Sequence, residues 1–271
     1  KKISCQFLLK FLKVKEFLQI SLIQADLFWL NKKKNISLFD DLISKIDKTD
    51  IILLPEMFNT SFSPSNIDLS EDMNGPTISW MKSIAKKKKC SISGTLMVND
   101  KGKVYNRLIW VFENGSLLSY DKSHLFSLAK EEKTIHKGNK KIIIEQSGWR
   151  ICPLICYDLR FPVFCRNNDE YDVLVFLSSW PEKRIDAWNI LLKARAIENQ
   201  CISIGVNRIG VDNSGINFPG ESNVYNSFGQ KILTLGDQKN TVKTIVLSKE
   251  KLSLRRRQMS FLKDRDSFSL H

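Results

Sequence analysis

Short apolar runs, each followed by a polar residue or a proline, constrain the fold of this chain more than any other feature. Residues 17–25, 50–54, 172–177 and 201–206 are dominated by Ile, Leu, Val and Phe, so they predict buried β-strands. Between residues 91 and 156 further strand-like runs follow one another, separated by turn sequences such as Asn-Asp-Lys-Gly and Glu-Asn-Gly. The middle of the chain is therefore expected to be rich in β-structure.

Helical periodicity occurs between the early strands and again in the second half. Ser37-Leu-Phe-Asp40 resembles a capping box and predicts a helix that begins there. Residues 77–88 predict a second helix, and residues 185–200 predict a third. The side chains of this third helix that are expected to face inward are Ile185, Trp188, Leu192 and Ile197.

The order of these elements favours one α/β domain, because no linker-like segment or internal repeat interrupts it. We expect the domain to span residues 17–248. Residues 1–16 are expected to form an accessory N-terminal extension, and residues 249–271 a C-terminal tail. Open α/β sheets place their chemistry in the loops that follow strand ends, which is where candidate site residues are expected.

Composition narrows the class of protein further. Of 271 residues, 42% are hydrophobic and 26% are charged, which is ordinary for a folded domain. The net charge of +13 would suit a nucleic acid, but the lysines are dispersed and no nucleic-acid-binding motif accompanies them, so a Lys-rich surface is expected. No apolar run reaches the roughly 18 residues that span a bilayer. Six cysteines without a signal-peptide pattern predict reduced thiols in a cytoplasmic protein.

Cys156 is the first candidate for chemistry. It ends the apolar run Ile-Cys-Pro-Leu-Ile and precedes Tyr-Asp-Leu-Arg-Phe-Pro, so it is expected at a strand-to-helix corner. Such a corner projects a side chain into a cleft, and the backbone N–H groups after it can stabilise an oxyanion. Because a free thiol is mostly protonated at neutral pH, a nucleophilic cysteine needs a nearby base or cation. A buried core cysteine is the alternative interpretation.

Two charged residues also follow strand ends. Glu56 comes after Leu-Leu-Pro, where partial desolvation raises the pKa of a carboxyl group and suits it to proton transfer. Lys122 follows another strand, where an ammonium group can lower the pKa of a thiol and hold an oxyanion. Taken singly, each is more commonly a solvated surface residue.

Three segments together resemble the nitrilase superfamily of carbon–nitrogen hydrolases. They are Leu-Pro-Glu-Met-Phe around Glu56, Tyr-Asp-Lys-Ser-His-Leu-Phe around Lys122 and Ile-Cys-Tyr-Asp-Leu-Arg-Phe-Pro around Cys156, in that family's order. The resemblance covers residues 18–247 and implies a single-domain, four-layer α-β-β-α sandwich. It implies that Glu56 is the general base, Lys122 the charge stabiliser and Cys156 the nucleophile. A second family glutamate matches Glu131, and the family also implies no cofactor and at least a homodimer.

Within the superfamily the chain is similar to the ω-amidases, which hydrolyse 2-oxoglutaramate and related monoamides of dicarboxylates. The strings Cys-Tyr-Asp-Leu-Arg-Phe-Pro-Val, Ser-Trp-Pro and Ala-Arg-Ala-Ile-Glu-Asn-Gln carry this similarity. Because such substrates bear a distal carboxylate, Arg160 is a candidate partner for it, and a structural interaction with Asp158 or with a helix end is the alternative. The backbone N–H of Tyr157 is expected to be a second oxyanion donor. Trp180 and Phe126 are candidate pocket walls.

Four alternatives remain open at this point. His124 lies near Lys122 and would serve a papain-like Cys-His hydrolase. Cys152 and Cys156 would supply half of a zinc site, although no second pair has ligand spacing. A basic nucleic-acid-binding protein would be supported by charge alone. A nitrilase, an aliphatic amidase or an N-carbamoyl amidase of the same superfamily would share the three catalytic candidates, so those residues do not discriminate among them.

Overall fold

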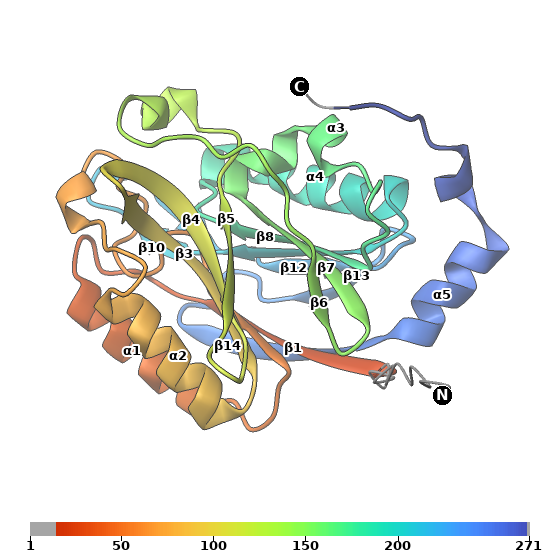
Figure 1. The fold of residues 1–271 in the computed structure, drawn as a ribbon, viewed down its shortest axis with the longest axis horizontal. Coiled ribbons are helices and arrows are strands. Elements are labelled where there is room, and N and C mark those ends of the chain that lie inside the picture. The colour runs from red at the N-terminus through yellow and green to blue at the C-terminus, as the bar shows by residue number, and fades with distance from the viewer. Residues whose placement is uncertain (1–14, 270–271) are drawn as a thin grey trace, which may run out of the picture.

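The apolar runs of the sequence form the central strands of two six-stranded sheets (Figure 1). A computed structural model describes residues 15–269 of the chain. The first sheet has the spatial order β14 (Thr241–Ser248), β1 (Phe17–Gln24), β2 (Ile51–Leu53), β3 (Ser91–Asp100), β4 (Lys103–Val111) and β5 (Leu117–Asp121). The second has the order β13 (Lys231–Thr234), β12 (Asn223–Tyr225), β9 (Ile202–Asn207), β8 (Val173–Ser178), β7 (Trp149–Ile155) and β6 (Ile144–Gln146).

Each sheet contains a parallel centre flanked by antiparallel strands. β1, β2 and β3 are parallel in the first sheet, and β7, β8 and β9 are parallel in the second. Parallel strands end at the same edge of a sheet, so the loops that follow them lie close together. The segments after β2 of the first sheet and after β7 and β8 of the second also lie close to one another, because residues from all three line one cavity.

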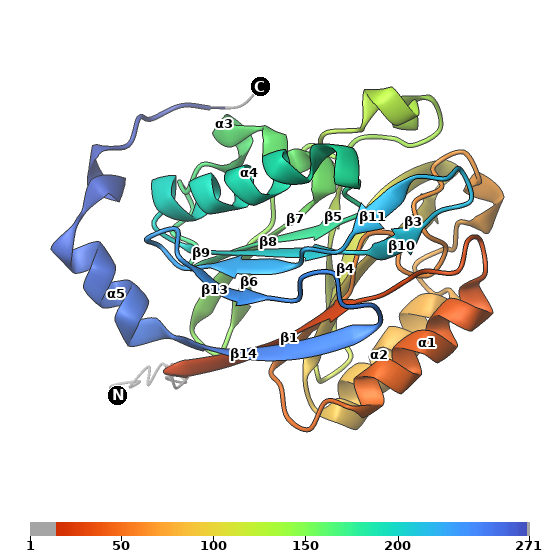
Figure 2. The ribbon, with the colours of Figure 1, turned by 180° about the vertical axis from the view of Figure 1, so that it is seen from behind.

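Helices cover the outer face of each sheet and complete four layers (Figure 2). The helices α1 (Lys32–Ser44) and α2 (Pro76–Lys88) lie on the first sheet, while α4 (Ile185–Glu198) and the short α3 (Pro162–Cys165) lie on the second. The single-domain α-β-β-α sandwich that the sequence predicts is confirmed.

Side chains of the central strands alternate between two cores, because successive residues of a strand point to opposite faces. In and just after β2, Ile51 and Leu53 join the core that links the two sheets, whereas Ile52 and Leu54 pack with α1 and α2. Burial on both faces holds this strand rigidly. The residue pair that follows it, Pro55 and Glu56, is consequently held in place as well.

Two helices differ from the sequence-based expectations. The first begins at Lys32 rather than Ser37, because the side chain of Asn31 caps it by accepting a hydrogen bond of 3.0 Å from Lys34 N. In α4, Ile197 does not face inward and is 45% exposed. The buried residues of this helix are Trp188, Leu192, Arg195 and Ala196. The sequence also gave no signal for the short hairpin of β10 (Ile209–Val211) and β11 (Asn217–Pro219).

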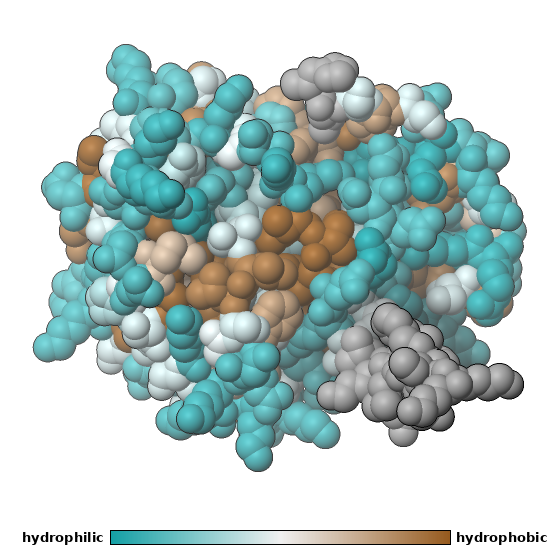
Figure 3. Space-filling model, viewed as in Figure 1, coloured by the Kyte–Doolittle hydropathy of each residue, from teal (hydrophilic) through white to brown (hydrophobic). Residues whose placement is uncertain are grey.

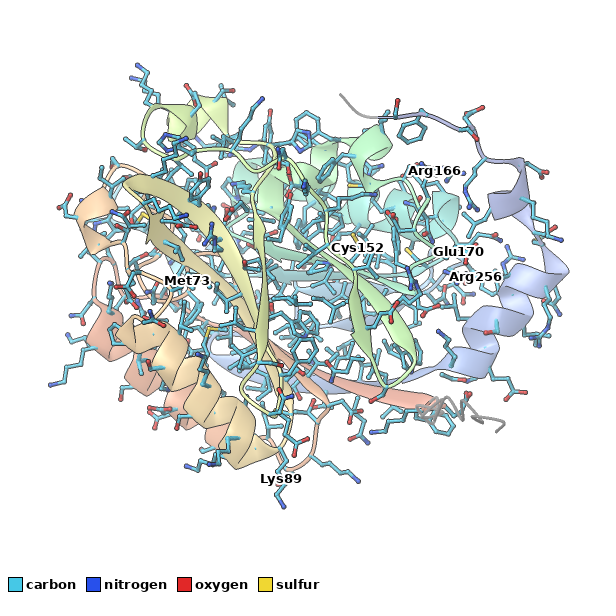
Figure 4. All side chains as sticks on the ribbon, viewed as in Figure 1. Met73, Lys89, Cys152, Arg166, Glu170 and Arg256 are labelled. Carbon is cyan, nitrogen blue, oxygen red and sulfur yellow. The ribbon has the colours of Figure 1, made fainter. Side chains whose placement is uncertain are left out.

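The segment expected as a C-terminal tail begins with α5 (Lys249–Gln258). Ser248 caps this helix, and Leu252 is buried beneath it. Arg256 reaches from α5 towards the second sheet, with its Nη1 atom 3.1 Å from Asp172 Oδ1 (Figure 4). This first part of the tail is therefore packed on the domain, and the boundary at residue 249 stays a prediction.

Most of the expected N-terminal extension, residues 1–14, lies outside the described residues. Its last two residues are attached to the domain. Lys15 Nζ lies 2.6 Å from Asp50 Oδ1, and Ser248 Oγ donates a hydrogen bond of 2.7 Å to Glu16 Oε1. The role of the extension stays a prediction.

Hydrophilic side chains cover most of the face in Figure 3, around an apolar area near its middle. Within residues 15–269, no helix is both long enough and apolar enough to cross a membrane. The five described cysteines are all free and buried.

Candidate active site

A cavity of about 270 Å³ opens where the loops after β2, β5, β7 and β8 meet. Glu56 follows β2, Lys122 follows β5, Cys156 follows β7 and Ser179 follows β8, so residues far apart in sequence share one wall. Other lining residues are Phe62, Phe126, Tyr157, Arg160, Trp180, Arg184, Asp212 and Phe218. The structure thus brings the three principal candidates together.

A cluster of three fully buried charged side chains, which we call the floor, lies at the base of the cavity, and two of them, Glu56 and Lys122, line it directly. Lys122 Nζ lies 2.9 Å from Glu56 Oε1 and 2.9 Å from Glu131 Oε2. Glu131, which matches the second family glutamate, is buried, while its neighbour Glu132 is exposed. One ammonium thus bridges two carboxylates, and none of the three side chains has exposed surface.

Neutral groups complete the hydrogen bonding of this cluster. Asn106, in the middle of β4, donates to Glu56 Oε1 at 2.9 Å and to Glu131 Oε1 at 3.1 Å. The backbone N–H of Ser179 donates to Glu56 Oε2 at 2.9 Å, and that of Phe126 donates to Glu131 Oε2 at 2.7 Å. Buried charges are tolerated when they are paired and hydrogen-bonded, as these are.

Burial and the charge of the partner act in opposite directions on the pKa values of Glu56 and Lys122. Desolvation raises the pKa of Glu56 and is only partly offset by the charge of Lys122. Burial alone would lower the pKa of Lys122, but the carboxylates of Glu131 and Glu56 outweigh it, so the pKa is raised. Lys122 is therefore cationic at neutral pH, whereas Glu56 has gained affinity for a proton.

The Cys156 thiol lies beside this cluster at the end of β7. Desolvation, followed by the negative charge of Glu56, raises the pKa of the thiol well above its usual value, while Lys122 opposes the shift. The resting thiol is therefore protonated and needs a base to become a nucleophile. The backbone of Cys156 has a φ of 40°, in the left-handed region that a non-glycine residue rarely adopts. The sharp turn directs the thiol into the cavity, where it also faces the carbonyl of Ser179.

Asp158 fixes the turn that carries the thiol. Its Oδ2 atom accepts hydrogen bonds from the Tyr120 hydroxyl at 2.7 Å and from Ile155 N at 3.0 Å. Its Oδ1 atom lies 2.8 Å from His124 Nδ1. Asp158 thereby ties the turn after β7 to the loop that carries Lys122.

Arg160, Tyr157, Trp180 and Phe126 all line the cavity. Arg160 makes no ion pair with Asp158; its guanidinium instead lies 4.9 Å from the centre of the Trp180 ring. The side chain of Arg160 is thus placed at the cavity wall.

The two alternatives that assigned other partners to the thiol gain no support from the geometry. His124 pairs with Asp158 and stacks on Phe161, with ring centres 3.6 Å apart, and it does not line the cavity. Cys152 is fully buried in the core between the layers (Figure 4). Across residues 15–269, no group of three or more His, Cys, Asp or Glu side chains is arranged to hold a metal ion.

Sequence reasoning missed several residues of the site, and Asn106 and Arg184 are two of them. Asn106 occurs within a strand, where a polar residue is usually taken to face solvent, and its role depends on the distant Glu56. Arg184 precedes α4 and lies 5.1 Å from the centre of the Phe126 ring at the cavity wall. Neither belongs to the segments that suggested the site.

The fold and the cavity define a class: α-β-β-α sandwiches in which a cysteine, a lysine and two glutamates gather beyond the strand ends, the architecture of the nitrilase superfamily. The chain belongs to the carbon-nitrogen hydrolase family, whose model matches residues 19–256. The superfamily predicted from the three sequence segments is confirmed.

Individual relatives narrow the similarity. ω-Amidase YafV of Escherichia coli strain K12 is 37% identical over 255 residues, which cover 93% of this chain and 98% of the relative. The 2-oxoglutaramate amidase of Bacillus subtilis strain 168 is 32% identical over 242 residues, covering 87% of this chain and 93% of the relative. A CN-hydrolase superfamily protein from Xanthomonas campestris, solved with an arsenic adduct in its active site, superposes with a TM-score of 0.92. It is 37% identical, and the match covers 95% of this chain and all of that one. The predicted similarity to the ω-amidase branch is confirmed.

Proposed function

We propose that this chain is an ω-amidase that hydrolyses the terminal amide of a small dicarboxylate monoamide, such as 2-oxoglutaramate, to the acid and ammonia. One observation carries the proposal. A thiol, a paired carboxylate and an ammonium converge in a cavity whose wall also presents the guanidinium of Arg160. The sequence similarity to YafV and to 2-oxoglutaramate amidase supports the choice of substrate class.

In the first half-reaction Glu56 accepts the thiol proton while Cys156 Sγ forms a bond to the amide carbon. The carbonyl oxygen becomes an oxyanion held by Lys122 Nζ and by the backbone N–H of Tyr157. One such donor typically contributes about 10²- to 10³-fold in rate. The C–N bond then breaks as Glu56 returns the proton to nitrogen. Ammonia departs, and the acyl group remains bound to Cys156 as a thioester.

In the second half-reaction water gives a proton to Glu56 and adds to the thioester carbon. The C–S bond breaks, the thiolate recovers the proton, and the carboxylic acid leaves. Both steps balance without a metal or an organic cofactor. Glu131 keeps Lys122 charged and fixed, since its carboxylate lies 2.9 Å from the ammonium.

Arg160 binds the distal carboxylate of the substrate in this proposal, because guanidinium groups bind carboxylates bidentately. Trp180 and Phe126 form apolar walls for the short carbon chain between the two ends. Such a division suits a substrate that is charged at one end and neutral at the other.

An ammonia-release assay over four compounds tests the proposal: 2-oxoglutaramate, succinamate, a short aliphatic nitrile and an N-carbamoyl amino acid. The first two should be turned over and the last two should be poor substrates. Cys156→Ala should abolish release, whereas Cys152→Ala, which removes a core thiol from the strand just before Cys156, should retain it. Preference for the nitrile or the carbamoyl compound would contradict the ω-amidase proposal and would assign the chain to another branch of the nitrilase superfamily. Full activity of Cys156→Ala would remove the proposed nucleophile.

We also propose that the protein assembles as a homodimer or higher homo-oligomer, as the family resemblance implies. Light scattering of the purified protein tests this, and a monomer at micromolar concentration would contradict it. A cytoplasmic location is the companion proposal, supported by five free cysteines among the described residues.

A further inference from the structure

Two arginines line the cavity beside each other, and only one was foreseen. Arg160 ends the turn after Cys156, and Arg184 directly precedes α4. The guanidinium of Arg160 stacks on Trp180 and that of Arg184 on Phe126, at 4.9 Å and 5.1 Å from the ring centres. Aromatic faces restrict where a guanidinium points, so both charges are held at the wall.

The backbone at Arg184 is also fixed. Its carbonyl oxygen accepts a hydrogen bond of 2.7 Å from the indole Nε1 of Trp180, the same ring on which Arg160 stacks. Trp180 thus connects the two arginines: it carries one guanidinium on its face and anchors the main chain of the other. The spacing of the pair is therefore built into the fold.

The charge of this pair is not balanced by the protein. Within residues 15–269, neither Arg160 nor Arg184 makes an ion pair, whereas the buried arginines Arg107, Arg195 and Arg208 all do. Partial burial, and next the positive charge of Arg160, lower the pKa of Arg184. Two like charges held side by side become favourable when an anion binds between them.

The acidic residue at the cavity rim does not fill this role. The carboxylate of Asp212 accepts hydrogen bonds from the backbone N–H groups of Ser214 and Ile216, at 2.8 and 2.9 Å. Its charge acts on Arg208 rather than on Arg184. The missing anion must therefore come from the ligand.

We infer that Arg184 and Arg160 form a two-guanidinium clamp that binds the acid end of the substrate and favours a 2-oxo acid over a plain carboxylate. This inference rests on the proposed amidase function and extends it. A single guanidinium satisfies the two oxygens of a carboxylate along one edge. The N–H groups of a second guanidinium can donate to a third acceptor oxygen beside the carboxylate. A 2-oxo acid presents such an oxygen, whereas a plain carboxylate does not.

Three amides of equal chain length test the clamp: 2-oxoglutaramate, glutaramate, which lacks the 2-oxo group, and pentanamide, which lacks the carboxylate as well. Arg184→Gln should lower kcat/KM about 10- to 100-fold for 2-oxoglutaramate and less for glutaramate, because glutaramate lacks the 2-oxo oxygen that Arg184 binds. For pentanamide the loss should be less than about 2-fold, because this amide makes no hydrogen bond to either arginine. Arg184→Lys should recover only part of the loss, since it keeps the charge without the fork.

Lys183→Gln is the matched control, because it removes one positive charge from the adjacent, exposed residue, which is not part of the cavity wall. It should leave all three kcat/KM values within about 2-fold of wild type. Equal losses on all three amides in Arg184→Gln, or equal losses in Lys183→Gln, would overturn the clamp while leaving the amidase proposal intact.

A binding measurement separates the two proposals. Calorimetric titration of 2-oxoglutarate, the acid product, into the Cys156→Ala protein reports on the clamp without any turnover. Adding Arg184→Gln to this variant should weaken binding about 10-fold or more. If wild type released no ammonia from any amide but this weakening was found, the clamp would stand and the amidase function would fall.

Discussion

The floor and the wall of the cavity differ in how their charges are balanced. On the floor, Glu56, Lys122 and Glu131 are fully buried, each charge has an opposite charge within 3 Å, and the two carboxylates also accept hydrogen bonds from neutral donors. On the wall, Arg160 and Arg184 are only half-buried and stack on rings, without a carboxylate partner in the part of the chain described. The charges of the floor are paired within the protein, which suits a catalytic cluster that keeps one arrangement through every turnover. The charges of the wall are unpaired, which suits the binding of an anionic ligand.

The largest loss of stability is expected from a substitution of Lys122, at the centre of the floor. Lys122→Met should lower the free energy of unfolding by about 3–5 kcal/mol, because it leaves two buried carboxylates without a cation. The proposed activity should be lost together with it. Urea unfolding followed by circular dichroism measures the change. Lys87→Met, which removes an exposed lysine on α2, should stay within about 0.5 kcal/mol of wild type. An unchanged stability in Lys122→Met would mean that the floor is not charge-coupled.

Glu56→Gln should separate activity from stability at the same place. Turnover should fall about 10²- to 10⁴-fold, the range for loss of a general base. Stability should be retained or increased, because burial raises the pKa of Glu56 and its ionised form therefore costs folding free energy at neutral pH. The variant leaves Lys122 paired with Glu131 alone, one charge against one. Activity above a tenth of wild type would remove Glu56 from the mechanism.

The same contrast explains what the sequence revealed. The floor was predictable because Glu56, Lys122 and Cys156 each follow an apolar strand, and strand ends converge in open α/β sheets. Glu131 was predicted only through its match to a family glutamate, because the loop that holds it and Glu132 has no periodicity to tell the buried side from the exposed side. Asn106 could not be predicted for a different reason: its place in the site depends on hydrogen bonds to Glu56 and Glu131, which come from other loops.

The wall was harder to predict than the floor. Arg160 was foreseen because it belongs to the segment around Cys156 that resembles the family. Arg184 was not, because its position depends on where α4 begins and on a ring, Phe126, that comes 58 positions earlier in the chain. Local patterns also failed at Ser37 and Ile197, where a cap by Asn31 and the packing of α4 on the sheet decided the outcome. Tertiary contacts, rather than local propensity, set these features.

The pH dependence of the reaction tests whether the floor alone controls proton transfer. Because the pKa of Glu56 is raised above its usual 4.5, the proposed base loses its ionised form at a higher pH than an exposed glutamate does. We expect kcat/KM for the uncharged pentanamide to fall as the pH drops through that raised pKa. Arg184→Gln should show the same acidic limb. A limb that moves in Arg184→Gln would mean that the wall takes part in the proton transfer.

The smallest expected effect concerns the ring that supports the wall. Phe126→Leu removes the aromatic face beneath Arg184 but keeps the backbone N–H that donates to Glu131. A cation–π contact at a partly exposed site contributes about 0.5–1 kcal/mol, so KM for 2-oxoglutaramate should rise about 2- to 5-fold. The value of kcat should change little, because the floor keeps all of its contacts. Pentanamide, which has no carboxylate, should show no such rise in KM; an equal rise for both amides would assign Phe126 to general packing of the pocket rather than to the placement of Arg184.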